Sequence, residues 1–303
     1  MKKIIVYILI IISLTSCSHN ISQEQHIGYN QDIYELLNLE PGINKLEFNS
    51  ELKVGIIDTG FDLKHPNLNL ISMNQIGNQT KDQHGTTISG IISAKANEIN
   101  DFSGVIPGLS LYVYDLPSEK LKVENLTLAI NELRENDVDV INISLATNMY
   151  DEELYNAVLN AINEDIVIVA SGGNFGDNDK YYPASFEIPG LISVGALNMS
   201  NDVLASSTYN DTIDVWAPGE NVYSLGASHN SLDNYVGTSV STPFVTSLVA
   251  KVIGNCNDKN LNPGQIEKLI KKSATSFSTK WQNKEVNVFL INFKKTLNEC
   301  KNN

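Results

Sequence analysis

The chain has 303 residues, 42% of them hydrophobic, and it carries a formal net charge of −14. That length is enough for one large α/β domain with a buried core, and too little for two such domains and a linker. Its 35 acidic and 21 basic residues form no basic stripe, which argues against nucleic acid as a partner. The acidic excess is typical of a soluble, mildly repulsive surface, although attraction of a cationic substrate is an alternative.

Residues 1–17 differ from the rest of the chain. Two lysines precede an apolar run, residues 4–12, that is too short to cross a bilayer as a helix. A basic start, an apolar middle and small residues before a cut site are typical of a secretory signal. The segment ends in Leu14-Thr15-Ser16-Cys17, which resembles a bacterial lipobox, whose Cys is lipidated and becomes the new N-terminus. We therefore expect an exported bacterial lipoprotein, anchored to the cell membrane through Cys17; an ordinary signal peptide with an incidental Cys is the alternative.

Residues 18–49 are polar, with many Asn, Gln and Glu, and we expect an irregular N-terminal arm or linker before the folded domain of residues 50–303.

If Cys17 carries lipid, Cys256 and Cys300 remain as a pair. An even pair in an exported protein is compatible with a disulfide. Two unpaired thiols are also compatible with the sequence, because spacing along the chain does not show proximity.

From Leu52 onward, continuous apolar runs of strand length alternate with helical patterns. The runs are Val54 to Ile57, Leu111 to Tyr114, Val138 to Ser144, Ile166 to Ala170 and Leu191 to Val194. Two stretches between them place apolar residues on one helical face: Leu126, Ala129, Ile130 and Leu133, and then Leu154, Tyr155, Val158, Leu159 and Ile162. Such strands and amphipathic helices predict an α/β fold, with a parallel central sheet and helices on both faces. Ligands of these folds bind beyond the carboxyl ends of the strands.

Asp58 directly follows the first of these strands, in the segment Val54-Gly55-Ile56-Ile57-Asp58-Thr59-Gly60. A buried strand that ends in an ionisable residue and a Gly turn presents a carboxylate in a constrained, partly dry place. Asp-Thr-Gly also occurs in aspartic proteases, but those enzymes need two carboxylates that share a proton. The sequence holds no second Asp-Thr-Gly or Asp-Ser-Gly, which argues against that class.

His84 and Ser239 each stand at the start of a predicted helix. Glycines after His84 allow close approach of the backbone and tight packing of its helix. Ser239 lies in Gly237-Thr238-Ser239-Val240-Ser241-Thr242-Pro243, and the apolar residues beyond this segment predict a buried helix. We expect Pro243 in the first turn, where its missing N–H costs nothing. The helix dipole and free N–H groups near Ser239 can stabilise an oxyanion, although simple N-capping is the alternative.

Asp58, His84 and Ser239 occur in the chain order of the subtilisin triad. From about Leu52 to about Gly254 the sequence resembles the subtilase family. Val-Gly-Ile-Ile-Asp-Thr-Gly, His-Gly-Thr and Gly-Thr-Ser-x-Ser-x-Pro correspond to the three active-site boxes of that family. Further matches are Val140-Ile141-Asn142-Ile143-Ser144-Leu145, Val169-Ala170-Ser171-Gly172-Gly173-Asn174, Tyr182-Pro183-Ala184, Ile192-Ser193-Val194-Gly195-Ala196 and Trp216-Ala217-Pro218-Gly219.

The resemblance implies a subtilisin-like three-layer fold and a serine endopeptidase that works through an acyl-enzyme, without a cofactor. Ser239 would attack the peptide carbonyl after His84 takes its proton, and Asp58 would hold the imidazole tautomer. The Asn174 side chain and the Ser239 backbone N–H would bind the oxyanion. The partner would be a peptide or protein substrate of a monomeric enzyme. The residues implied to bind this substrate are Ser144, Leu145, Ala146, Gly173 and Tyr181.

The cleft segments depart from the family's pattern. Many subtilases have Ser-Leu-Gly-Gly where this chain has Ser144-Leu145-Ala146-Thr147, and the added side chains should narrow the cleft. Tyr181 stands where the family often has a small residue at the base of the primary specificity pocket, so we expect a restricted pocket. Asp177 or Asp179 would favour a basic substrate residue there, unless both belong to a solvated acidic loop.

Calcium is compatible with the resemblance but is not predicted. Residues 97–103 correspond in position to a calcium loop of some subtilases. Asn67, however, stands where a liganding Asp is usual, and Ca²⁺ favours carboxylate charge.

Two functional hypotheses remain. Residues 18–49 are too short for the folded inhibitory pro-domain usual in secreted subtilases, which favours restricted processing over bulk digestion, such as leader removal from lantibiotic precursors. The competing hypothesis is a catalytically silent lipoprotein that uses a subtilase fold for binding. Its only support is the unusual Val240-Ser241-Thr242 after Ser239, because all three triad residues and Asn174 are present.

Overall fold

The computed structural model describes residues 29–39, 52–74, 83–98, 101–116, 122–256 and 260–302. The predicted signal peptide, with Cys17, lies outside these ranges. Within them, no helix has the length and apolar character needed to span a bilayer. The strands of the main sheet are β1 (Val54–Asp58), β2 (Asn69–Ser72), β3 (Ser110–Asp115), β4 (Val140–Ile143), β5 (Val167–Ser171), β6 (Leu191–Leu197), β7 (Val215–Pro218), β10 (Thr275–Trp281) and β11 (Lys284–Leu290).

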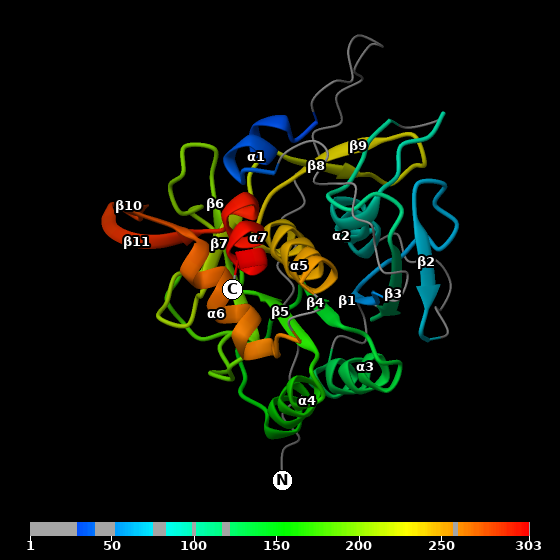
Figure 1. Ribbon diagram of the computed structural model, residues 1–303, viewed down its shortest axis with the longest axis horizontal. Helices are drawn as coiled ribbons and strands as arrows, with labels where there is room; N and C mark the ends of the chain where they lie inside the picture. Colours follow the sequence, from blue (N-terminus) through cyan, green and yellow to red (C-terminus); the bar gives the residue numbers. More distant parts are fainter. Residues whose placement is uncertain are drawn as a thin grey trace, which may run out of the picture.

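The main sheet has the order β10-β11-β7-β6-β5-β4-β1-β3-β2, and it crosses the molecule from left to right in Figure 1. All strand pairs from β2 to β7 are parallel. Successive side chains of these strands enter opposite core clusters, because a strand alternates its faces. Val54 and Ile56 of β1 belong to one cluster and Ile57 to the other. The sheet is therefore buried on both sides, as predicted.

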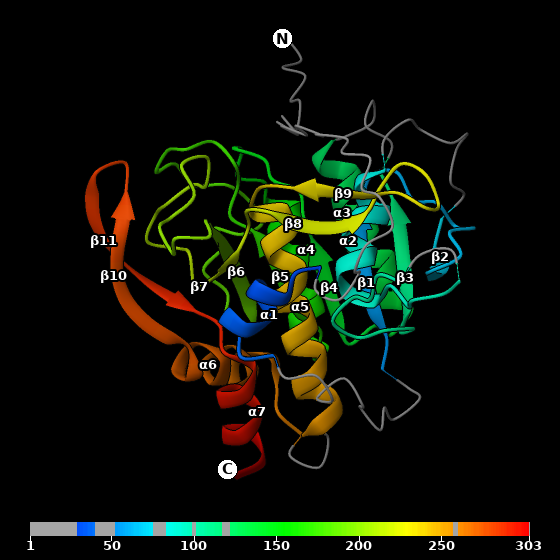
Figure 2. The ribbon, with the colours of Figure 1, turned by 90° about the horizontal axis from the view of Figure 1, so that it is seen from above.

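Helices cover both faces of this sheet (Figure 1 and Figure 2). The helices are α1 (Gln31–Leu36), α2 (His84–Ser93), α3 (Val123–Glu135), α4 (Glu152–Asn163), α5 (Thr238–Asn255), α6 (Pro263–Ser273) and α7 (Phe293–Asn302). The apolar residues of α3 and α4 share one core cluster, and those of α2 and α5 share the other. The predicted three-layer α/β fold is confirmed.

The N-terminal arm is not wholly irregular, contrary to our expectation. Residues 31–36 form α1, because Ile33 and Leu37 lie one turn apart and both enter the main core. The side chain of Asn30 also bonds the backbone of Tyr223 twice, donating to its carbonyl and accepting from its N–H, each at 2.9 Å. This part of the arm is thus packed onto the domain.

The C-terminal region adds elements that the sequence had not indicated. Strands β10 and β11 form an antiparallel hairpin that extends beyond the sheet edge in Figure 2, and β11 joins β7 through the pair Leu290 and Trp216. A separate antiparallel pair consists of β8 (Val222–Leu225) and β9 (Leu232–Tyr235). Cys256, just after α5, forms a disulfide with Cys300 of α7, which decides between the two alternatives that the sequence left open.

Candidate active site

Asp58 and His84 meet at the carboxyl ends of the central strands. Asp58 is the last residue of β1, and His84 is the first of α2. The Nδ1 atom of His84 lies 2.6 Å from Oδ1 of Asp58, and both residues are buried. An ionised carboxylate only accepts hydrogen bonds, so the ring donates from Nδ1, which leaves Nε2 as the basic nitrogen. A histidine in this state is suited to act as a general base.

Helix α2 is fixed against the loop that follows Asp58. The N–H groups of Gly85 and Thr86 donate to the carbonyls of Thr59 and Gly60, at 2.6 and 3.2 Å. Further along α2, a Cβ atom added at Gly90 would lie 2.5 Å from a serine hydroxyl of β8. Only glycine permits this approach, as the sequence predicted, and the approach helps to hold His84 in place.

Ser239 is the second residue of α5, and its carbonyl has an unusual partner. The helix begins at Thr238, so Pro243 lies in its second turn, and our expectation of a first-turn proline was wrong. A residue at that position normally donates its N–H to the carbonyl four residues earlier, which here belongs to Ser239. Proline has no N–H to donate. The Ser144 hydroxyl donates to the Ser239 carbonyl instead, at 3.1 Å.

A chain of buried polar side chains links this bond to the middle of α5. The hydroxyl of Ser144 accepts from Nδ2 of Asn142 at 3.0 Å, and Oδ1 of Asn142 accepts from the hydroxyl of Thr246 at 2.8 Å. Ser144 directly follows β4, and β4 pairs with β1 up to the residue before Asp58. Ser239 is therefore hydrogen-bonded to the residue that directly follows β4, the strand next to the one that carries Asp58.

Asn174 contacts the residues immediately before Ser239. Its Oδ1 accepts from the backbone N–H of Thr238 at 2.7 Å and from the Thr238 hydroxyl at 3.0 Å. Because the backbone N–H can only donate, this contact fixes Oδ1 as the acceptor and leaves Nδ2 as the donor. Gly237, with φ at 131°, lies so close that an added Cβ would sit 2.9 Å from Nδ2. The Asn174 amide therefore presents a donor beside the start of α5.

This constellation agrees with the sequence comparisons. A protein-family model described as Peptidase_S8, the subtilase family, matches residues 49–289. The chain belongs to the subtilase family. It is similar to Subtilisin Savinase of Lederbergia lenta, with 31% identity over 243 residues, which are 76% of this chain and 86% of that protein. Subtilisin NAT of Bacillus subtilis subsp. natto is 32% identical over 219 residues, or 67% of this chain, and the match spans only 56% of that relative's length.

Solved structures share the fold of this subtilase at lower identity. The prenylagaramide maturation protease PagA has a TM-score of 0.73 and 22% identity, over 86% of this chain and 99% of PagA. A cold adapted subtilisin-like serine proteinase has a TM-score of 0.69 and 20% identity, over 83% of this chain and 97% of its own. At these identities the likeness concerns the fold.

The unusual residues after Ser239 have structural partners in this subtilase. The hydroxyl of Ser241 donates toward the carbonyls of Ala217 and Pro218, at 3.2 and 3.0 Å. The hydroxyl of Thr242 donates to the carbonyl one turn earlier, at 2.7 Å. Both residues are fully buried. Their hydroxyls are thus hydrogen-bonded within the packed interior, so the one feature that favoured a silent subtilase has a packing explanation.

The residues predicted to bind substrate differ in their surroundings. Leu145 is buried in the core beside α3 and α4, while Ala146 is half-buried. Thr147 exchanges two backbone hydrogen bonds with Tyr182, at 2.9 and 2.7 Å. Gly173, with φ at 103°, accepts a bond from the backbone of residue 208. These bonds hold the backbone of the two segments, and the role of the segments in binding substrate stays a prediction.

Tyr181, which was predicted to stand at the base of the primary pocket, is buried and has a partner that the sequence did not indicate. Phe175, the residue after Asn174, stacks on the Tyr181 ring with centroids 3.9 Å apart and an interplanar angle of 8°. The Tyr181 hydroxyl donates to Oδ2 of Asp177 at 2.7 Å. Burial, and then this hydrogen bond, raise the pKa of the Tyr181 phenol. One carboxylate oxygen of Asp177 is thus hydrogen-bonded to Tyr181, whereas the side chain of Asp179 is exposed to solvent.

Asn67, which stands where a liganding Asp is usual in the family, is buried. Its Nδ2 donates to the Lys95 carbonyl at 2.8 Å, a bond that does not involve Oδ1, the atom that a cation would bind. Across the described ranges, no group of three or more His, Cys, Asp or Glu residues is arranged to hold a metal ion. Calcium stays compatible with the family and is not predicted.

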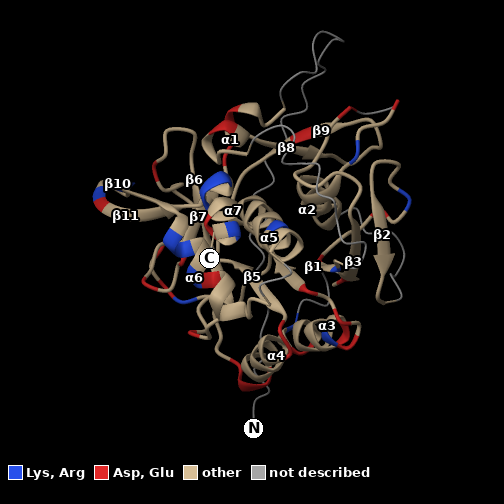
Figure 3. Ribbon diagram, in the orientation of Figure 1, with Lys and Arg blue, Asp and Glu red and all other residues tan. Residues whose placement is uncertain are grey.

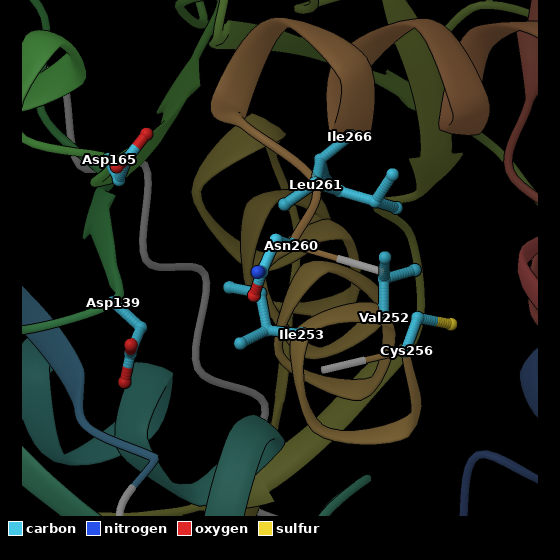
Figure 4. Close-up of a pocket in the computed structure, with 8 residues that line it drawn as sticks. All are labelled: Asp139, Asp165, Val252, Ile253, Cys256, Asn260, Leu261 and Ile266. Carbon is cyan, nitrogen blue, oxygen red and sulfur yellow. The ribbon is translucent and has the colours of Figure 1, made fainter. Parts of the chain in front are cut away.

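The structure also contains a cavity of about 400 Å³, whose lining residues are drawn in Figure 4. It is lined by Asp139, Asp165, Val252, Ile253, Cys256, Asn260, Leu261 and Ile266. Asp139 and Asp165 precede β4 and β5, so the cavity lies at the amino ends of the strands. Helix α5 has 18 residues and is about 27 Å long, which separates the cavity from Ser239. The cavity is not part of the candidate active site.

Proposed function

We propose that this subtilase is a serine endopeptidase with Asp58, His84 and Ser239 as its catalytic triad. The observation that carries the proposal is the 2.6 Å contact between His84 Nδ1 and Asp58 Oδ1, which leaves Nε2 to take the Ser239 proton. The Ser239 oxygen attacks the peptide carbonyl, and the Nε2–H then protonates the leaving amine. Water, activated by the same imidazole, releases the acyl group from Ser239.

Asn174 and the backbone N–H of Ser239 are proposed to bind the oxyanion of the tetrahedral intermediate. The acceptor side of the Asn174 amide is occupied by Thr238, which directs Nδ2 to the space beside the start of α5. The N-terminal N–H groups of a helix add positive potential at the same place. A donor that is fixed before the reaction stabilises the developing charge without reorganisation.

Labelling with a fluorophosphonate probe tests the triad. Wild type should label and Ser239→Ala should not, and kcat should fall on the order of 10⁶-fold when the nucleophile is removed. Ser276→Ala, at an exposed serine of β10, is the matched control and should label as wild type. A correctly folded wild type that neither labels nor hydrolyses any peptide would instead support the silent binding lipoprotein.

We also propose a narrow primary specificity, in which the rings of Phe175 and Tyr181 occupy the base of the pocket. The support is the stacking of these two rings, which makes a rigid pair next to Asn174 in the sequence. The variant Tyr181→Gly should raise cleavage after large apolar residues, relative to small ones, on the order of tenfold. Tyr181→Phe keeps the stacked ring and loses only the bond to Asp177, so it should keep the restriction. Cleavage profiles on a peptide library measure both, and broad cleavage by wild type would contradict the proposal.

A narrow pocket suits a processing protease, and we propose that this subtilase removes a leader segment from a peptide precursor such as that of a lantibiotic. Maturation proteases, among them PagA, are built on the same fold. Site-specific cleavage of a purified precursor, read by mass spectrometry, tests this role. Degradation of the precursor at many sites would count against it.

The proposed location is the cell membrane of a bacterium, to which the exported protein is anchored by lipid on Cys17. The support is the sequence alone, in the basic, apolar and small-residue order of residues 1–17. Labelled palmitate should enter wild type and not Cys17→Ala, and wild type should fractionate with membranes. A protein that keeps residues 1–17 would contradict the proposal.

A further inference from the structure

Four aromatic side chains form a cluster beside the proposed cleft, and we call it the aromatic shelf: Tyr150, Tyr155, Tyr182 and Phe186. Tyr150 stands edge-on to Tyr182 and Phe186, with ring centroids 5.6 and 5.7 Å away and interplanar angles of 87° and 88°. Tyr155 meets Phe186 edge-on at 5.3 Å. Edge-to-face contacts of this kind are favourable and hold the rings in place.

The aromatic shelf has one exposed ring, Tyr150, which packs on a buried ring, Phe186. Phe186 is buried, whereas Tyr150 is 53% exposed and its neighbour Met149 is 43% exposed. The Tyr150 hydroxyl donates to Oε2 of Glu152 at 2.8 Å, which fixes the ring in addition to its aromatic contacts. A large exposed side chain that is already immobilised loses little conformational entropy when a partner binds.

The shelf continues the wall of the proposed cleft. Tyr182 follows the pocket residue Tyr181 and is hydrogen-bonded to Thr147 through the backbone. Tyr150 lies six residues after Ser144, whose hydroxyl bonds the Ser239 carbonyl. At about 3.3 Å per residue, Tyr150 is at most roughly 20 Å from Ser144 along this segment. An extended substrate covers that distance in about six residues, so the shelf is within reach of a substrate residue up to roughly six positions from the cleaved bond.

Acidic residues lie directly beside the shelf. Helix α4 begins with Glu152 and Glu153, which are exposed, while Asp151 is occupied in capping the helix. Figure 3 shows acidic positions at α4, whereas basic positions gather on α6, α7 and the hairpin of β10 and β11. An exposed tyrosine ring next to carboxylates matches a cation on a long apolar stem, as in Lys or Arg.

We propose that the aromatic shelf binds a Lys or Arg side chain of the substrate, four to six residues on the amino-terminal side of the cleaved bond. The cation lies over the Tyr150 ring near Glu152, and its stem packs against Met149. The amino-terminal side is assigned because the primary pocket holds the residue whose carbonyl is attacked, and the shelf lies beyond that pocket on the same wall. This inference rests on the proposed endopeptidase function.

A lysine walk through a synthetic peptide tests the shelf. One cleavable peptide carries Lys in turn at the fourth, fifth and sixth positions before the cleaved bond, and its parent has Ser at all three. In wild type, the best Lys peptide should have a kcat/KM about three- to tenfold above the parent, through KM. Tyr150→Ala should abolish this advantage, and Tyr150→Phe should keep most of it. Phe289→Ala, at an exposed ring of β11, is the control and should behave as wild type.

The outcomes separate the shelf from the proposed function. If the parent is cleaved but Lys gives no advantage at any of the three positions, or the advantage survives Tyr150→Ala, the shelf is refuted and the endopeptidase stands. If no peptide is cleaved and the fluorophosphonate does not label, the endopeptidase fails. The Ser239→Ala variant still permits a binding test, in which anisotropy of the labelled peptides should show the same Lys preference and the same loss with Tyr150→Ala.

Discussion

The two ends of helix α5 are held in different ways. At its amino end, the N–H of Thr238 donates to Asn174, and the hydroxyl of Ser144 donates to the carbonyl of Ser239. At its carboxyl end, the chain is joined covalently through Cys256 to Cys300, with Cα atoms 6.2 Å apart. In Figure 2 the helix runs from the level of β8 and β9, past the sheet, to α7.

We infer that the amino end of α5 controls the position of the catalytic groups, whereas the carboxyl end contributes mainly to the free energy of unfolding. Hydrogen bonds are directional, so the bonds at the amino end set the position of Ser239 and of the Asn174 amide. A disulfide mainly restricts the unfolded chain and acts little on geometry far away. Changes at the two ends should therefore affect different measurements, which makes the comparison open to experiment.

The largest expected effect is on stability, from loss of the disulfide. Cys256 and Cys300 are 44 residues apart, and closing such a loop is worth roughly 4 kcal/mol in the chain-entropy model. The double variant Cys256→Ala, Cys300→Ala should lower the free energy of unfolding by about that amount in a denaturant titration. Its kcat/KM should stay within about threefold of wild type at a temperature where the variant remains folded. A large loss of activity in the folded variant would break the proposed separation.

The next effect is on catalysis, from the amino end. Asn174→Ala removes the donor proposed for the oxyanion, and kcat should fall by about 10²–10³-fold, with KM little changed. Its free energy of unfolding should fall by about 1–2 kcal/mol, since the bonds from the Thr238 N–H and the Thr238 hydroxyl are both lost. Pre-steady-state kinetics and a denaturant titration on the same preparation give both values. An unaltered kcat would remove Asn174 from the mechanism.

At the amino end of α5, the sequence predicted the local motifs but not the contact between distant residues. The sequence predicted the helix, the nucleophile candidate and the nearby Asn174, because each belongs to a local motif with a known spacing. The bond from Ser144 to Ser239 was not foreseen, because it joins residues 95 apart. A signal was nevertheless present. Pro243 stands four residues after Ser239, which left that carbonyl without its usual helical donor.

The residues predicted to bind substrate were less predictable than the catalytic residues. Tyr181 was expected to restrict the pocket, but its partner Phe175 was not foreseen, since the stacking depends on how the long connection between β5 and β6 folds back on itself. The helix α1 was missed for a similar reason. Its apolar residues, such as Ile33, are few and acquire their role only through contact with a distant core. The disulfide likewise required proximity that spacing does not give.

The smallest effect tests the middle of α5, between the two ends. The Thr246 hydroxyl donates to Oδ1 of Asn142, whose amide in turn donates to Ser144. Thr246→Val keeps the shape but leaves this buried oxygen without its donor, so the free energy of unfolding should fall by about 1–2 kcal/mol. If the polar chain positions Ser239, kcat should also fall by a few-fold. Thr127→Val, at a helix-surface hydroxyl bonded only to its own turn in α3, is the control, and its kcat should match wild type. A Thr246→Val variant with lowered stability and an unchanged kcat would show that Thr246 and Asn142 stabilise the fold but do not position Ser239.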